Sequence, residues 1–135
     1  MDPSEWDWSR PVFDHVHLRV RDLQAAKAFY ETVLEPLGIP LLFDTGRMVA
    51  FPNLALSADG PPTERAHIAF IGASREQVDA FHEAGVAAGY RDNGAPGLRA
   101  YMPGYYAAYL LDPDENNVEA LYRDVGCAGH GIGDW

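Results

Sequence analysis

The chain has 135 residues, a net charge of −10 and a pI near 4.7, with 10 Lys and Arg against 20 Asp and Glu. This charge argues against nucleic acid or an anionic membrane surface as a partner. A hydrophobic fraction of 47% predicts one globular domain spanning residues 1–135. Cys127 is the only cysteine, and there is neither a secretory signal nor an apolar run of about 20 residues, so we expect a soluble, cytoplasmic protein.

The first half of the chain predicts the order β-α-β-β-β. Residues 1–11 hold two tryptophans and are expected to form an arm that docks on the body or on a partner subunit. A strand is predicted over 12–20, and Asp22 then predicts the N-cap of a helix whose apolar stripe ends near Leu37. Three short strands follow, at 39–43, 47–51 and 54–57. Together they form the first module, residues 12–57.

The second half repeats this order after a linker. Residues 58–64 contain two prolines and have linker composition, and the second module is expected over residues 65–123. It begins with a strand at 66–71, and a capping box from Ser74 to Gln77 then starts a helix that ends near Gly89. Strands are predicted at 90–92, 105–111 and 117–122, with a Gly, Pro and aromatic loop at 93–104. Residues 124–135 are a Gly-rich tail.

A matched spacing supports an internal duplication. Phe29 follows His15 at the same separation as Phe81 follows His67, and each histidine lies in a strand while each phenylalanine lies on a helix. With the matched order of elements, this predicts an α+β fold: two tandem β-α-β-β-β modules forming a curved mixed sheet around a ligand cavity. His17, one step further along the first strand, is then equivalent to Ala69.

The duplication predicts a candidate metal site. Equivalent strands of the two modules should lie opposite each other, so that His15 and His67 point into one cavity. Strand alternation places Glu119 on the face away from its apolar neighbours, towards the same cavity. Two imidazoles and one carboxylate can hold a divalent transition metal and leave positions open for a substrate. The alternative is that both histidines are satisfied core residues and that Glu119 is an edge carboxylate.

The motifs along the chain are similar to those of a known superfamily. They are His15-Val-His-Leu-Arg-Val, Asp22-Leu, Phe29-Tyr-Glu, the strand around His67, and the run from Leu111-Asp-Pro-Asp to Asn117-Val-Glu. Between about residues 13 and 123 the chain resembles the vicinal oxygen chelate superfamily, which includes glyoxalase I, fosfomycin-resistance thiol transferases, bleomycin-resistance proteins and extradiol dioxygenases. The resemblance implies His15, His67 and Glu119 as ligands of Zn, Mn, Fe(II), Ni or Co, a small-molecule substrate, and a homodimer.

Two departures from the superfamily pattern carry expectations of their own. Glyoxalase I uses a fourth ligand, a Glu or Gln, on the last strand of its first module, and residues 54–57 contain neither. Lactoylglutathione lyase activity is therefore disfavoured. The usual Gly after Asp-Pro-Asp is Glu115 here, and we expect Asn116 to take over its positive φ.

Other residues have weaker claims to a role. His17 shares a face with His15 and could act as a general acid or base, or could be a wall residue. Tyr109 falls where fosfomycin-type relatives have a substrate-contacting tyrosine, although core packing is the more favoured interpretation. Arg47, Arg99 and Arg123 could hold an anionic group, or could be solvated. Cys127 and His130 of the tail could add metal ligands.

The leading hypothesis is a divalent-metal-dependent enzyme of the glyoxalase or dioxygenase type, with lyase, isomerase, dioxygenase or thiol-transferase chemistry. The alternative is a metal-free protein that sequesters a small aromatic or cationic molecule, as bleomycin-resistance proteins do. The tyrosines at 101, 105 and 106 motivate this alternative. A third possibility, a degenerate member serving as a dimer scaffold, is the least favoured because all three ligand positions are filled.

Overall fold

A computed structural model of the protein describes residues 1–124. Within them, two α-helices and eight strands form two β-α-β-β-β modules, which confirms the predicted α+β architecture. The helices are α1 (Leu23–Leu34) and α2 (Arg75–Ala87), with 3-10 turns η1 (Pro3–Glu5) and η2 (Glu35–Leu37).

The strands form two separate four-stranded sheets with the same topology. Sheet A has the order β1 (Val16–Arg19), β4 (Leu54–Ser57), β3 (Met48–Phe51), β2 (Phe43–Asp44). Sheet B has the order β5 (His67–Ile71), β8 (Asn117–Arg123), β7 (Tyr105–Leu111), β6 (Arg91–Leu98). In each sheet the first strand of the module lies parallel to the last, and the other pairs are antiparallel.

Both predicted helix caps are present. The Asp22 carboxylate accepts a hydrogen bond from the backbone N–H of Ala25 at 3.1 Å, and the Ser74 hydroxyl accepts one from that of Gln77 at 3.1 Å. The Gln77 side chain accepts from the N–H of Ala73 rather than from that of Ser74, so the capping box is shifted by one residue. The two caps fix where each helix leaves its first strand, which accounts for the repeated spacing in the sequence.

One predicted loop is wrong. Residues 93–104 were expected to be irregular, but β6 continues through Leu98 and pairs with β7. Glycine and proline are tolerated there because β6 is an edge strand. Its pairing register with β7 shifts twice, between Asp92 and Gly94 and between Gly94 and Gly97. The first strand is also shorter than predicted and begins at Val16.

The expectation for the turn between β7 and β8 is also wrong. Glu115 itself adopts φ 67°, and Asn116 does not take over the positive φ. The buried Asn116 side chain has another task, since its amide oxygen accepts from the N–H of Ala66 and its amide nitrogen donates to Asp112. Asn116 thereby ties the turn to the start of β5, whereas the exposed Glu115 pairs with Arg91.

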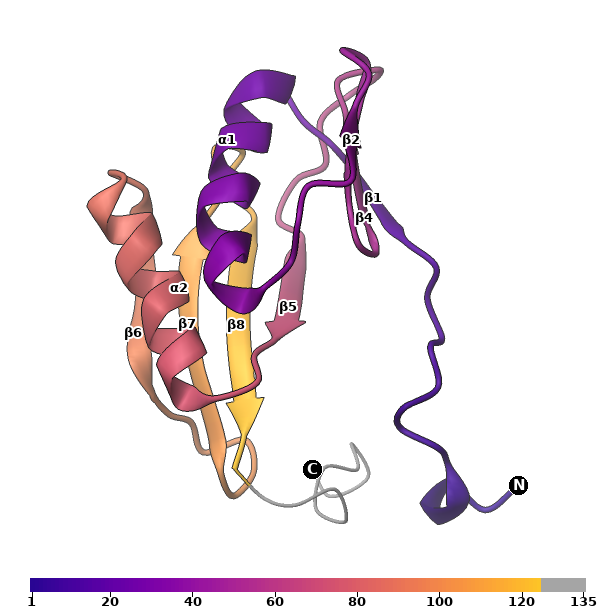
Figure 1. Cartoon of the computed structure of the whole chain (residues 1–135), viewed down its shortest axis with the longest axis vertical. Coiled ribbons are helices and arrows are strands. Elements are labelled where there is room, and N and C mark those ends of the chain that lie inside the picture. Colours follow the sequence, from indigo (N-terminus) through magenta and orange to yellow (C-terminus); the bar gives the residue numbers. More distant parts are fainter. Residues whose placement is uncertain (125–135) are drawn as a thin grey trace.

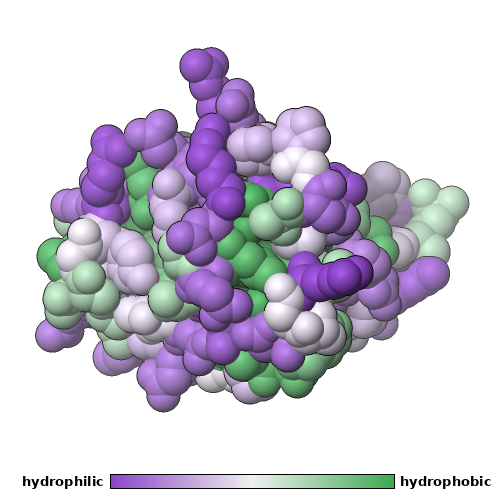
Figure 2. Space-filling model, turned by 90° about the horizontal axis from the view of Figure 1, so that it is seen from above, coloured by the Kyte–Doolittle hydropathy of each residue, from purple (hydrophilic) through white to green (hydrophobic). Residues whose placement is uncertain are grey.

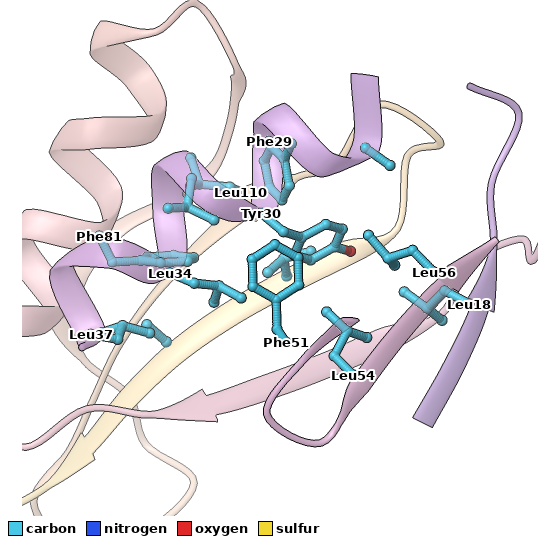
Figure 3. Packing of buried hydrophobic residues seen from close by; sticks show 14 of the residues in the cluster. Leu18, Phe29, Tyr30, Leu34, Leu37, Phe51, Leu54, Leu56, Phe81 and Leu110 are labelled. Atoms are coloured by element: carbon cyan, nitrogen blue, oxygen red, sulfur yellow. The ribbon is translucent and has the colours of Figure 1, made fainter. Parts of the chain in front are cut away.

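A single core is shared by both modules. Apolar side chains from α1, α2 and one face of each sheet converge in it, as Figure 3 shows for Tyr30, Phe51, Phe81 and Leu110. The Tyr30 hydroxyl donates to Asp112 at 2.8 Å, which joins α1 to the turn before β8. The other face of each sheet, called here its front, is turned away from this core and carries the polar residues of interest.

Figure 1 shows the arrangement of the layers. Helix α2 covers sheet B, and α1 lies beside α2 with the strands of sheet A on its other side. The segment before β1 extends away from both sheets (Figure 1). Seen from above, the end of the molecule is largely hydrophilic, with apolar atoms visible in a central recess (Figure 2). Among residues 1–124, no helix has the length and apolar character needed to span a bilayer.

Candidate active site

Two of the three predicted metal ligands meet on the front of sheet B. His67 begins β5 and Glu119 lies on the adjacent parallel strand β8, with Ala69 opposite Glu119 in the register. His67 Nε2 lies 2.7 Å from Glu119 Oε1. The Glu119 side chain is 2% exposed and that of His67 is 54% exposed. The carboxylate is therefore fixed inside the sheet, and the imidazole is open to an incoming ligand.

Tyr105 supports the same carboxylate from β7. Its hydroxyl donates a hydrogen bond to Glu119 Oε2, so both carboxylate oxygens have a partner. Burial, and then this bond to Glu119, raise the pKa of Tyr105, which keeps its hydroxyl a donor. From the sequence, Tyr105 was expected to begin a strand and was singled out only as one of three tyrosines that could bind a small molecule. Tyr105 pairs with Arg123, two steps along the same face from Glu119, so its role depends on the register between β7 and β8, which the sequence does not show.

His15 does not join this pair within one chain. It precedes β1, its side chain is 57% exposed, and its Nδ1 lies 2.7 Å from the Asp14 carboxylate. Over residues 1–124, no three His, Cys, Asp or Glu side chains gather as a possible metal site. The bond to Asp14 leaves Nε2 of His15 available to another partner. The tail residues Cys127 and His130 lie outside the described part of the chain.

His17 belongs to a polar chain on the front of sheet A. Its Nε2 lies 2.7 Å from the Ser57 hydroxyl, which donates to Asp59 at 2.8 Å. The bond from Ser57, and more weakly the charge of Arg19, hold the pKa of Asp59 below its usual value. Because the hydroxyl gives its one hydrogen to Asp59, it accepts from Nε2–H of His17 and leaves Nδ1 as the nitrogen with a free lone pair. Sequence reasoning identified His17 but not Ser57 or Asp59.

The two histidine contacts have the same strand geometry. His17 faces Ala55 in the register and bonds to Ser57, two residues further along β4. His67 faces Asn117 and bonds to Glu119, two residues further along β8. By position relative to the helix caps at Asp22 and Ser74, His15 is the counterpart of His67. By the hydrogen bonds across the strands, His17 is the counterpart of His67.

Tyr109 is both packed and close to His67. It is 7% exposed in a small cluster on the front of sheet B, and it pairs with Glu119 in the register. Its ring centroid lies 6.3 Å from that of His67. Burial is the main cause that raises the pKa of Tyr109, followed by the hydrogen bond to Tyr101. The two interpretations offered by the sequence are therefore compatible.

A cavity of about 780 Å³ lies elsewhere and contains none of these residues. Ion pairs line it, namely Arg21 with Asp114 at 2.8 Å and Arg91 with Glu115 at 2.9 Å. The front faces are the better candidates for chemistry, because these four charged groups of the cavity are already paired with one another.

Comparisons with known proteins agree with this architecture. A model of the glyoxalase/bleomycin resistance protein/dioxygenase superfamily matches residues 12–120. The crystal structure of a glyoxalase/bleomycin resistance protein from Albidiferax ferrireducens T118 is 36% identical, covers 82% of this chain and 98% of that chain, and superposes with a TM-score of 0.68. A search of curated proteins found no match.

Two further crystal structures share the fold at lower identity. Lactoylglutathione lyase from Agrobacterium tumefaciens is 23% identical over 84% of this chain and 94% of that one, with a TM-score of 0.63. A glyoxalase/bleomycin resistance protein/dioxygenase family enzyme from Burkholderia phytofirmans PsJN is 20% identical over 82% and 97%, with a TM-score of 0.64. At these identities the likeness shows the fold alone.

Proposed function

Because the chain belongs to the glyoxalase/bleomycin resistance protein/dioxygenase superfamily, we propose that it is a divalent-metal-dependent enzyme acting on a small oxygen-chelating substrate. Its metal ligands are His67, Glu119 and His15. With one cysteine and an acidic surface, its proposed place is the cytoplasm.

The observation that carries the proposal is the pair formed by His67 and Glu119. Nε2 of the half-exposed His67 imidazole lies 2.7 Å from an oxygen of the buried Glu119 carboxylate, and the Tyr105 hydroxyl donates to the other oxygen. Imidazole and carboxylate donors suit Zn, Mn, Fe(II), Ni and Co. When bound, such a metal supplies Lewis-acid polarisation to adjacent oxygens of a substrate. The chain's own contribution is to fix the carboxylate and to keep the imidazole accessible.

His15 is proposed to reach this pair from a second copy of the chain. The front of sheet A carries Phe43, 46% exposed, and the front of sheet B carries Ile71, 80% exposed. Packing the front of one protomer's sheet A against the front of the other's sheet B would bury both side chains. The same contact brings His15 of one chain to His67 and Glu119 of the other.

His17 and Tyr109 have the proposed catalytic roles. The bonds through Ser57 to Asp59 orient the His17 ring and leave Nδ1 able to accept a proton from substrate. Tyr109 lies next to His67, where its ring contacts a bound substrate. Lactoylglutathione lyase activity is not proposed, since β4 offers Ala55 and Ser57 on its front and no carboxylate or amide.

Metal content tests the ligand assignment. Protein purified without chelator is expected to hold about one divalent metal per chain, and the His67→Ala and Glu119→Gln variants are expected to lose most of it. His82→Ala is the matched control, because His82 of α2 forms a similar pair with Asp92 of β6 at 2.9 Å. Equal metal in wild type and His67→Ala, measured by inductively coupled plasma mass spectrometry, would refute the assignment.

Mixing two inactive variants tests the shared site. A dimer of one His15→Ala chain and one His67→Ala chain contains one complete ligand set if His15 acts across the interface. Random pairing makes about half of the co-refolded dimers mixed, and each of these has one complete site out of two, so the sample should regain about a quarter of the wild-type metal. If His15 acts within its own chain, mixing restores none.

A metal-free binding protein is the second candidate, and the tyrosines around Glu119 favour it. In that case Zn, Mn, Fe(II), Ni and Co would all leave the thermal unfolding midpoint unchanged, whereas a metalloenzyme is stabilised by its metal.

A further inference from the structure

An aromatic wall stands beside the pair of His67 and Glu119. Tyr105 and Tyr109 both lie on the front of β7, and the Tyr101 ring meets that of Tyr105 edge-on at 5.1 Å. The Tyr109 hydroxyl lies 3.5 Å from that of Tyr101. Tyr101 is 52% exposed, whereas Tyr105 and Tyr109 are 4% and 7% exposed, so a planar group entering beside His67 meets fixed rings rather than flexible side chains.

Arg99 lies over this wall. Its guanidinium carbon is 5.2 Å from the Tyr109 ring centroid, and its two terminal nitrogens donate to the carbonyls of Ala95 at 2.6 Å and Leu98 at 3.5 Å. Within residues 1–124 no carboxylate lies within ion-pair distance of Arg99. Other arginines of this acidic chain do pair with carboxylates, namely Arg19, Arg21, Arg75 and Arg91. Arg99 therefore retains further N–H donors, and its positive charge is not neutralised by a carboxylate of residues 1–124.

Two glycines of β6 leave room for this stack. A Cβ on Gly94 would lie 2.7 Å from Cδ1 of Tyr109, and one on Gly97 would lie 3.1 Å from a terminal nitrogen of Arg99. The register shifts of β6 occur at these same residues. The edge strand is thus shaped so that the guanidinium can lie over the tyrosine.

The positive charge of Arg99 favours an anionic ligand over a cationic one. A guanidinium has five N–H donors, so Arg99, stacked on a ring and bonded to two carbonyls, still has N–H groups that can donate to a carboxylate. The same guanidinium repels a cation that would otherwise be attracted by the tyrosine faces. Glu119 opposes an anion less than a free carboxylate would, because both of its oxygens already accept hydrogen bonds.

We propose that the site takes a small planar carboxylic acid with a neighbouring oxygen. Its carboxylate pairs with Arg99, its ring lies against Tyr109, and the neighbouring oxygen points to His67 and Glu119. This inference rests on the proposed function for the location of the site, and it adds the class of substrate and Arg99 as the residue that determines specificity.

Calorimetric titration with salicylate tests the proposal on the protein with the metal it carries as purified. Wild type is expected to bind salicylate and to bind its neutral amide, salicylamide, about tenfold or more weakly. Arg99→Gln should lose about tenfold or more of the salicylate affinity and leave that for salicylamide unchanged. Arg75→Gln is the matched control, because Arg75 lies 4.9 Å over Tyr106, which points to the other face of β7.

A second variant, Gly97→Ala, tests the same inference if Arg99→Gln does not fold. Gly97→Ala keeps the charge of Arg99 but displaces its guanidinium, and is expected to weaken salicylate binding several-fold with unchanged circular dichroism. Wild-type salicylate affinity in Arg99→Gln, or equal binding of acid and amide, overturns the inference. Metal content separates the two proposals. If wild type holds metal but binds salicylate no more tightly than salicylamide, only this inference is rejected. A metal-free wild type that still requires Arg99 for salicylate rejects only the metalloenzyme.

Discussion

At the scale of single residues, Glu119 organises the candidate site. Its side chain is 2% exposed, and a buried carboxylate is costly unless both oxygens have partners. His67 supplies one partner and Tyr105 the other. The bond from Tyr105 also sets which way the carboxylate faces, and thereby which oxygen is presented beside His67.

Replacing Tyr105 by Phe should therefore weaken metal binding without removing a ligand. Loss of the hydrogen bond leaves Oε2 unpaired and the carboxylate free to rotate, and supporting bonds of this kind are worth roughly 10–100-fold in metal affinity. Competition with a chromophoric chelator measures the change.

The matched control for this variant is Tyr106→Phe. The Tyr106 hydroxyl donates to Asp79, and its side chain points to the other face of β7, so metal affinity should stay at the wild-type value. An affinity of Tyr105→Phe equal to that of Tyr106→Phe would show that Tyr105 has no part in the site.

At the scale of elements, close packing of α2 on β7 depends on a glycine. A Cβ added to Gly85 would lie 2.4 Å from Cδ1 of Leu110, which is fully buried. Alanine within a helix gains about 1 kcal/mol over glycine, whereas overpacking a filled core costs about 1–3 kcal/mol. The packing cost is the larger of the two effects, because Leu110 is fully buried and its Cδ2 and Cγ atoms also lie within 3.1 and 3.3 Å of the added Cβ.

Gly85→Ala is accordingly expected to lower the free energy of unfolding by on the order of 1 kcal/mol, as measured by urea denaturation. Adding Leu110→Val removes the clashing methyl groups, so the double variant should show a favourable coupling energy. A Gly85→Ala protein more stable than wild type would mean that helix propensity outweighs the packing.

The helices and most strands followed from local chemistry. The caps at Asp22 and Ser74 and the strands over residues 54–57 and 105–111 were predictable, since side-chain capping and apolar runs act over a few residues. The full extent of β6 could not be predicted from the sequence. Its Gly and Pro residues indicate a loop locally, and only its position at the sheet edge permits a strand.

At the scale of the whole molecule, three tyrosines are buried in their protonated form. Burial is the first cause that raises the pKa of Tyr30, Tyr105 and Tyr109. Unfolded tyrosine ionises near pH 10. The stability that these groups contribute is therefore fully present below pH 10 and is lost as the pH rises above it, because only the unfolded chain then releases their protons.

Alkaline titration followed at 295 nm should show this difference. Of the seven tyrosines, these three are expected to ionise only as the chain unfolds, and the urea midpoint should fall as the pH is raised past 10. Tyr109→Phe should remove one tyrosine from the delayed group. Ionisation of all seven near pH 10 with near-ultraviolet circular dichroism intact would contradict the prediction.

By itself, the sequence determined the α+β class, the two modules and the identity of His67 and Glu119 as residues of one face. These depend on local periodicity, on helix caps and on strand alternation, and each of these is determined by residues close together in the sequence. It also singled out His15 and His17, but it could not say how far each lies from the other module.

Only the tertiary structure decided how the faces are arranged. Both modules turn their apolar faces into one shared core, so the fronts of the two sheets face away from that core, and His15 does not meet His67 within a chain. The partners Tyr105, Ser57 and Asp59, and the stack of Arg99 on Tyr109, likewise depend on strand pairing between distant residues. Such pairing depends on the packing of the whole chain, to which residues far apart in the sequence contribute jointly.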